Sequence, residues 1–206
     1  TIINLIPRFY DVSSGAITLN GVDIRDVRQK DLLDYIGYIP QKGLLFSGDI
    51  ASNLRVGKPD ATEEDMQNAL KTAQAYDFVM EKEGGLNADV AQGGKNFSGG
   101  QRQRLCIARA IIKQPKIYIF DDSFSALDYQ TDRKLHAALK EQTKASINFI
   151  VAQRIGTIMN ADQIIVLDQG KAVGIGTHQE LLANNKVYQE MAYSQLSKEE
   201  LEKASL

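Results

Sequence analysis

The sequence predicts an α/β fold, with a mostly parallel sheet flanked by helices and a small antiparallel β part. Apolar runs at 116–120 and 146–153 flank a helical pattern at 128–143, and strand, helix, strand is the order of a right-handed parallel βαβ unit. Asn20 and Gly21 separate two short β runs, and this dipeptide is the strongest short signal of an antiparallel hairpin. A long stretch of helix signals in the middle of the chain indicates a helical insertion.

The first elements of the chain are expected to be short. Residues 1–6 resemble the end of a helix without a start signal, and Pro7 limits how far that helix can extend. We therefore expect Thr1 to mark a cut within a helix. The hairpin strands are predicted within 16–24, and the run YIGYIP at 35–40 predicts a further short strand.

Helix signals dominate approximately residues 50–110, which predicts a helical subdomain between α/β core parts at 1–49 and 111–206. An amphipathic helix is expected at 62–81, where a threonine and an aspartate form a capping pair ahead of an apolar stripe. After a glycine-rich loop, a second helix is predicted at about 99–113.

The last part of the chain is expected to contain two β runs and a helix. The runs lie at 163–170 and 171–176, and the helix begins with a capping box formed by Thr177 and Glu180. The polar tail at 196–206 has opposite charges at helical spacing, so we expect a solvated helix or a fraying terminus there.

Composition argues against several classes of function. The 206 residues have a formal net charge of −2 and no broad basic patch, so a nucleic-acid partner is not expected. The single cysteine, Cys106, offers no disulfide framework and favours a reducing compartment. His136 and His178 lack partners at metal-ligand spacing. No apolar run approaches the ~18 residues that a bilayer span needs.

The most specific chemical signal is NFSGGQRQR at 96–104. Its two glycines let the backbone pass close to a ligand. Ser98 precedes a helix N-terminus, where unpaired N–H groups and the helix dipole favour phosphate. An ordinary serine N-cap is an equally good interpretation of this motif alone. The context favours a ligand, because Ser98 precedes Asp121 by 23 residues, the apolar strand lies between them, and SALD follows.

These motifs closely resemble the nucleotide-binding domain of ABC transporters, in order and over essentially the whole chain. The matching segments are SGGQ (Ser98, Gly99, Gly100, Gln101) with the family signature, IYIFD (Asp121) with the Walker B strand, SALD (Asp128) with the D-loop, YIPQ (Gln41) with the Q-loop, and VAQR (Gln153) with the switch position. The resemblance implies a P-loop NTPase-like core with an inserted helical subdomain. It also implies ATP and Mg²⁺ as cofactors, with Asp121 and Gln41 as the metal contacts.

The segments LIPRFYDVSSGAITLNGVDI and LLFSGDIASNL resemble the exporter branch of this family, the multidrug and lipid exporters with fused membrane and nucleotide domains. That branch implies a domain at the cytoplasmic face of the cell membrane, which contacts a transmembrane domain through its Q-loop region. The family's phosphate-binding loop should end where this chain begins, and Thr1 matches only its last residue. Because that loop supplies the phosphate cradle and its lysine, we expect the chain as it stands to bind ATP poorly or not at all.

Two further departures concern the residues that the resemblance implies are catalytic. Asp122 occupies the position of the glutamate that orients the attacking water, and its carboxylate is set back by ~1.5 Å, one C–C bond. Gln153 replaces the switch histidine, so it can donate a hydrogen bond to the γ-phosphate but cannot carry a positive charge. Together they resemble the slow site of a heterodimeric exporter.

In this family each ATP lies between two domains, so the signature residues would serve the ATP of a second nucleotide-binding domain. We expect a heterodimer, and a homodimer remains an alternative. Two other functions stay open. One is a soluble ABC-type ATPase, which upstream membrane spans would exclude. The other is a non-catalytic regulatory or scaffold domain, which Asp122 and Gln153 favour but the intact SGGQ and SALD oppose.

Overall fold

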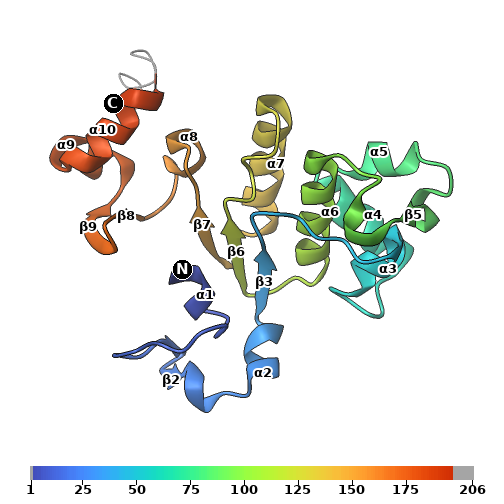
Figure 1. Cartoon of the computed structure of the whole chain (residues 1–206), viewed down its shortest axis with the longest axis horizontal. Helices are drawn as coiled ribbons and strands as arrows, with labels where there is room; N and C mark the ends of the chain where they lie inside the picture. Colours follow the sequence, from blue (N-terminus) through green and yellow to red (C-terminus); the bar gives the residue numbers. More distant parts are fainter. Residues whose placement is uncertain (1, 197–206) are drawn as a thin grey trace. The chain divides into compact units, whose positions relative to one another are not determined.

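The computed structural model describes residues 2–196 and divides them into two compact units. The first unit ends at Val151 and the second begins at Ala152. Figure 1 shows the first unit from the blue α1 to the yellow-brown β7, and the second unit from α8 to the red α10. The subdomain boundaries predicted from the sequence follow a different division of the chain, and they remain a prediction.

A three-stranded parallel sheet forms the centre of the first unit (Figure 1). Its strands are β3 (Ile36–Ile39), β6 (Ile117–Asp121) and β7 (Ile147–Val151), in the order β3-β6-β7. Helix α7 (Tyr129–Gln142) connects β6 to the parallel neighbour β7. The predicted βαβ unit is therefore confirmed, and β6 is the central strand, with its first four side chains buried.

The predicted antiparallel hairpin is also confirmed. Strands β1 (Thr18–Leu19) and β2 (Val22–Asp23) pair through the two turn residues, Asn20 with φ 51° and Gly21 with φ 82°. Positive φ at both positions is what a type I′ turn requires, and asparagine and glycine tolerate it best. The short helix α1 (Ile2–Leu5) ends before Pro7, as expected.

One apolar cluster includes residues of the strands β3 and β6. It includes residues of α1, of the 3₁₀ turn η1 (Ile24–Asp26) and of α2 (Gln29–Asp34), a helix that the sequence did not reveal. Its buried members are Ile3, Ile24, Leu32, Ile36, Ile117 and Ile119. The cluster therefore joins α1 and the hairpin region to β3 and β6.

A larger apolar cluster joins the sheet to α7 and to four further helices, which Figure 1 shows grouped beside β3. These are α3 (Ile50–Arg55), α4 (Glu63–Thr72), α5 (Tyr76–Met80) and α6 (Gly99–Ile112). Between them lie the strand pair β4 (Gly48–Asp49) and β5 (Asp89–Val90) and the 3₁₀ turns η2 (Gly85–Asn87) and η3 (Gln92–Gly94). Cys106 lies in this core at 2% exposure, and burial raises the pKa of its thiol.

The single helix expected at 62–81 is wrong, because the chain forms α4 and α5 with a break between them. The capping box of Thr62 and Asp65 is present. Gln74 then adopts φ 56°, while Ala75 N–H donates to Leu70 O at 2.7 Å and Gln74 N–H donates to Lys71 O at 3.0 Å. This is a Schellman ending. Because its left-handed residue is glutamine and not glycine, the usual stop signal is missing from the sequence.

Gly57, just after α3, lies so close to α6 that only glycine fits there. A Cβ on Gly57 would lie 2.2 Å from the backbone oxygen of Arg109. We expect Gly57→Ala to destabilise the protein by about 1–3 kcal/mol, the usual cost of overpacking. Thermal unfolding measures this, with Gly156→Ala as the control, because a Cβ on Gly156 would meet no heavy atom within 4 Å. Equal melting temperatures for the two variants would contradict the predicted clash.

The second unit packs a β-hairpin against three helices. Its elements are α8 (Ile155–Ile158), β8 (Ile164–Asp168), β9 (Lys171–Gly176), α9 (His178–Asn184) and α10 (Lys186–Gln195). The two β runs and the capping box of Thr177 and Glu180 are confirmed. Helices α8 and α10 were not predicted. Asn185 ends α9 and caps α10 by accepting from Tyr188 N–H at 2.8 Å. From 197 on, the predicted tail lies outside the described residues.

Buried His178 on α9 contacts a residue of this second core. Its Nδ1 lies 2.6 Å from the hydroxyl of Tyr188, and burial lowers the pKa of the imidazole. Within residues 2–196, no helix combines the length and the hydropathy that a membrane crossing requires.

Candidate functional site

Two adjacent carboxylates follow the buried central strand. Asp121 is the last residue of β6, and Asp122 begins the loop after it. Asp122 has φ 47°, a left-handed conformation that aspartate tolerates better than most residues. Its N–H donates to Val151 O at 2.9 Å, and its carbonyl accepts from Ser125 Oγ at 3.0 Å. Bonds on both sides of Asp122 therefore fix the backbone at this point.

The adjacent strand, β3, brings Gln41 to the same edge of the sheet. Gln41 Nε2 donates to Asp122 Oδ2 at 3.0 Å, across 81 residues of sequence. Buried Ser123 reinforces the connection by donating from Oγ to Ile39 O at 2.9 Å. Since a carboxylate only accepts hydrogen bonds, the amide nitrogen of Gln41 must face Asp122, and its Oε1 is the atom left for another ligand. The structure thus brings Gln41, Asp121 and Asp122 together.

Asp121 has a partner that the sequence did not reveal. The hydroxyl of Tyr38 on β3 lies 3.0 Å from Asp121 Oδ2 and 3.0 Å from Asn4 Oδ1 on α1. Burial and, after it, the bond to Asp121 raise the pKa of Tyr38 to about 12. The phenol therefore keeps its proton at neutral pH.

The signature residues begin helix α6. Ser98 Oγ accepts from Gln101 N–H at 3.2 Å, and Gln101 Oε1 accepts from Ser98 N–H at 3.0 Å. This capping box is the ordinary structural role weighed against phosphate binding, and here it is present. Gly99 has open space around it, whereas a Cβ on Gly100 would lie 3.3 Å from Ala126 O. The signature therefore contacts the loop that leads to Asp128.

Asp128 also has a structural role, as the N-cap of α7. Its Oδ1 accepts from Thr131 N–H at 2.9 Å, and bonds with Thr131 lower the pKa of the carboxyl. Gln153 belongs to the second unit, where its carbonyl accepts from Gln195 Nε2 at 2.9 Å. Thr1 lies outside the described residues.

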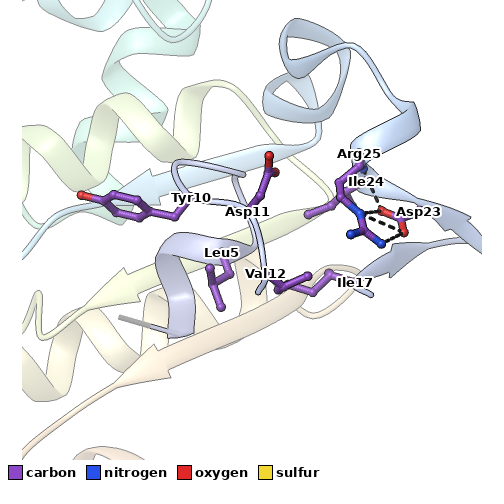
Figure 2. Close-up of a pocket in the computed structure, with 8 residues that line it drawn as sticks. All are labelled: Leu5, Tyr10, Asp11, Val12, Ile17, Asp23, Ile24 and Arg25. Atoms are coloured by element: carbon purple, nitrogen blue, oxygen red, sulfur yellow. Dashed lines mark hydrogen bonds and ion pairs between the residues drawn. The ribbon is translucent and has the colours of Figure 1, made fainter. Parts of the chain in front are cut away.

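A small pocket beside the hairpin does not add a ligand site. Figure 2 shows its lining, in which Arg25 is bound to the carboxylate of Asp23. The closest contact of that ion pair is 2.7 Å, and hydrogen bonds from Arg25 lower the pKa of Asp23 to about 2. The cavity of about 10 Å³ has room for no more than about one water molecule. Tyr10 also lines this cavity.

The side chains at the sheet edge suit Mg²⁺, which keeps water and phosphate ligands, better than an ion that is held by protein side chains alone. Among residues 2–196, no three His, Cys, Asp or Glu side chains are grouped so that they could hold an ion. Mg²⁺ is usually bound by one or two carboxylates together with waters and substrate phosphates. Asp121 and the amide oxygen of Gln41 therefore fit an ion that arrives with a nucleotide.

The parallel sheet with two acids at the carboxyl end of its central strand, a neighbouring glutamine and a glycine-led helix agrees with the ABC-type nucleotide-binding fold that the sequence motifs resemble. A family profile described as "ABC transporter" matches residues 1–125. The chain belongs to the ABC transporter family.

Similar proteins narrow the branch of the family. The chain is 51% identical over 198 residues to an uncharacterized ABC transporter ATP-binding protein of Mycobacterium tuberculosis, covering 95% of this chain and 34% of that protein. It is 44% identical over 206 residues to the beta-(1→2)glucan export ATP-binding/permease protein NdvA of Nitrobacter winogradskyi, covering 100% of this chain and 34% of that protein.

The structure resembles that of a bacterial Atm1-family ABC exporter with ATP bound. The TM-score is 0.92 at 34% sequence identity, over 96% of this chain and 35% of the exporter chain. This chain thus spans about a third of the length of the relatives it matches.

Proposed function

We propose that the chain is the ATP-binding and ATP-hydrolysing part of an exporter, which couples ATP hydrolysis to substrate export across a membrane. The observation that supports this most is the hydrogen bond of Gln41 to Asp122 beside Asp121, at the carboxyl edge of the sheet. Ligands of open α/β sheets bind at that edge. The relatives named as export ATP-binding/permease proteins support the exporter branch.

The residues of this edge, and separately Gln153 of the second unit, have proposed roles towards the chain's own nucleotide. Asp121 would hold Mg²⁺, directly or through water, with the Gln41 amide oxygen as a second contact. Bound Mg²⁺ neutralises charge on the β- and γ-phosphates. Asp122 would orient the attacking water, and Gln153 would donate a hydrogen bond to the γ-phosphate. The short Asp122 and the uncharged Gln153 make slow hydrolysis the expected behaviour of this site.

The signature has a different proposed role. Ser98, Gly99, Gly100 and Gln101, with Asp128 beside them, would complete the site of a second nucleotide-binding domain. Their backbone lies at the N-terminus of α6, where N–H groups and the helix dipole favour phosphate. We further propose a transmembrane domain as partner through the Q-loop region, which places the domain at the cytoplasmic face of the membrane. A heterodimer fits the weakened site, and a homodimer is the alternative.

Nucleotide binding by the full-length exporter tests this proposal. We expect Mg·ATP to raise its melting temperature by several degrees, since ligand at 100 times Kd adds about 2.7 kcal/mol of stability. Asp121→Asn should remove most of the part that depends on Mg²⁺ and leave the shift in EDTA. Asp77→Asn, on the exposed face of α5, is the matched control. An ATP shift that is absent, or that is insensitive to Asp121→Asn, would contradict the proposal.

A non-catalytic regulatory domain is the second candidate. It is favoured by Asp122, which is only 8% exposed and whose carboxylate is already bound to Gln41. In that case ATP would bind and stabilise the protein, but no substitution at this site would restore hydrolysis.

A further inference from the structure

The hydroxyl of Tyr38 connects three elements of the first unit at the proposed metal carboxylate. It lies 3.0 Å from Asp121 Oδ2 at the end of β6 and 3.0 Å from Asn4 Oδ1 on α1. The ring of Phe9 packs edge-on against the ring of Tyr38, with centroids 5.5 Å apart. The phenol is therefore held in place by packing as well as by its polar contacts.

The register of the sheet explains why this tyrosine reaches Asp121. Tyr38 on β3 is directly opposite Ile119 on β6, and Asp121 lies two residues further along. Side chains two apart on a strand point to the same face, so Tyr38, Ile119 and Asp121 share one side of the sheet. A diagonal neighbour is within reach of a long aromatic side chain.

The hydrogen on the phenol has a preferred acceptor. A tyrosine hydroxyl has one hydrogen, and a carboxylate can only accept. Because a bond to an ionised acceptor is about twice as strong as a neutral one, the hydroxyl donates to Asp121. The phenol oxygen then needs a donor from Asn4. The flipped orientation of the Asn4 amide supplies it, with Nδ2 in place of Oδ1 facing the phenol oxygen.

We infer that Tyr38 is a positioning residue, which orients the Asp121 carboxylate for Mg²⁺ by donating to Oδ2 and leaving Oδ1 for the ion or its bound water. This inference rests on the proposed function. Carboxylates that bind metals are commonly held by such outer partners, and loss of one typically costs 10–100-fold in metal affinity or activity. Asn4 also contacts the phenol oxygen, which connects α1 to the same carboxylate.

Mn²⁺ binding to the full-length exporter with ATP tests the inference without measuring turnover. In Tyr38→Phe the ring and its packing remain, and only the hydroxyl is lost. We expect Mn²⁺ affinity in the presence of ATP, followed by electron paramagnetic resonance, to fall about tenfold. ATP affinity in EDTA should stay within about twofold of the parent, because the nucleotide contacts are unchanged. Tyr35→Phe is the control, since Tyr35 is 48% exposed at the end of α2.

The possible results separate this inference from the proposed function. A parent protein that binds no Mn·ATP would overturn the proposed function and this inference with it. A parent that binds Mn·ATP, with unchanged Mn²⁺ affinity in Tyr38→Phe, would overturn the inference alone. A loss of the same size for ATP in EDTA would show that Tyr38 only supports the fold, and it would overturn the inference too. A melting curve of Tyr38→Phe, measured alongside the parent, shows whether a loss of folding explains that last result.

Discussion

Replacing Asp122 by glutamate together with Gln153 by histidine is expected to raise ATP turnover at this site by up to about 100-fold, because errors of ~1 Å in near-attack geometry cost about that factor. The added methylene moves the carboxylate forward by ~1.5 Å, one C–C bond. The histidine adds a donor that can be charged, and charge-assisted hydrogen bonds are stronger than neutral ones.

The structure indicates how the longer side chain would be accommodated. The backbone of Asp122 is fixed through Val151 O and Ser125 Oγ, so the side chain and its neighbours must accommodate the extra length. The bond from Gln41 Nε2, 3.0 Å in the parent, must then rearrange. Glutamate tolerates the left-handed backbone at φ 47° less well than aspartate. A small loss of stability is therefore expected alongside the gain in rate.

Single-site turnover in the assembled exporter measures this effect, with the second site disabled by substitution in the partner domain. Asp77→Glu repeats the chemical change on an exposed part of α5 and should leave turnover as it was. The two single variants show whether the gains are independent. Normal single-site turnover in the parent would contradict the interpretation of this site as slow.

Strong local signals account for the parts of the fold that the sequence predicted. Asn20-Gly21 allows few alternatives to a tight hairpin, since both residues readily adopt positive φ. Likewise, the capping boxes at Thr62 and Thr177 fix helix starts within a few residues. The apolar run of β6 ends at Asp121 because the strand is buried up to that point. In each case the physical cause lies within a short stretch of chain.

The features that were missed depend on tertiary context. At the break, Gln74 adopts a left-handed conformation, which is unfavourable for a residue other than glycine. The sequence has no glycine at this position that would signal the end of the helix. Helix α10, which was not predicted, begins directly where α9 ends, and Asn185 serves as the cap of both helices. The break at Gln74 has no signal in the sequence that would separate it from an ordinary helix interior.

The contacts within the candidate site also depend on tertiary structure that the sequence does not show. The motif resemblance selected Gln41, Asp121 and Asp122, and the structure places them at one edge of the sheet. The motif resemblance could not reveal that Gln41 donates to Asp122 or that Tyr38 donates to Asp121, because these pairs are 81 and 83 residues apart in the sequence. Such contacts arise from the parallel register of β3 and β6 and not from any local pattern.

Gly100→Val is expected to slow ATP hydrolysis at the site of the second domain by about 100-fold or more, the cost of losing one preorganised donor of a transition-state site. In the structure, a Cβ at Gly100 already lies 3.3 Å from Ala126 O and 3.6 Å from Leu127 Cδ2. The two further methyl groups of valine must displace that loop or extend over the N-terminus of α6. Either result obstructs the phosphate approach proposed there.

Fold and function can be separated in this variant. Gly156→Val places the same side chain in the open space beside α8, and it should leave both sites active. Thermal unfolding of Gly100→Val should show only a modest loss, because the capping box of Ser98 and Gln101 does not use the Gly100 side. A drop in melting temperature large enough to unfold the domain at the assay temperature would make Gly100→Ala the variant to compare.

The decisive feature of this prediction is which site responds. If the signature serves the nucleotide of the second domain, Gly100→Val must leave ATP affinity at this chain's own site, around Asp121 and Gln41, within about twofold of the parent. The reason is that the expected loss of rate, about 100-fold, comes from a contact with the nucleotide of the other domain. Radiolabelled ATP trapping, resolved by subunit, measures the two sites separately. Loss confined to the chain's own site would contradict the division of labour, since it would mean that Gly100 acts on the same nucleotide as Asp121.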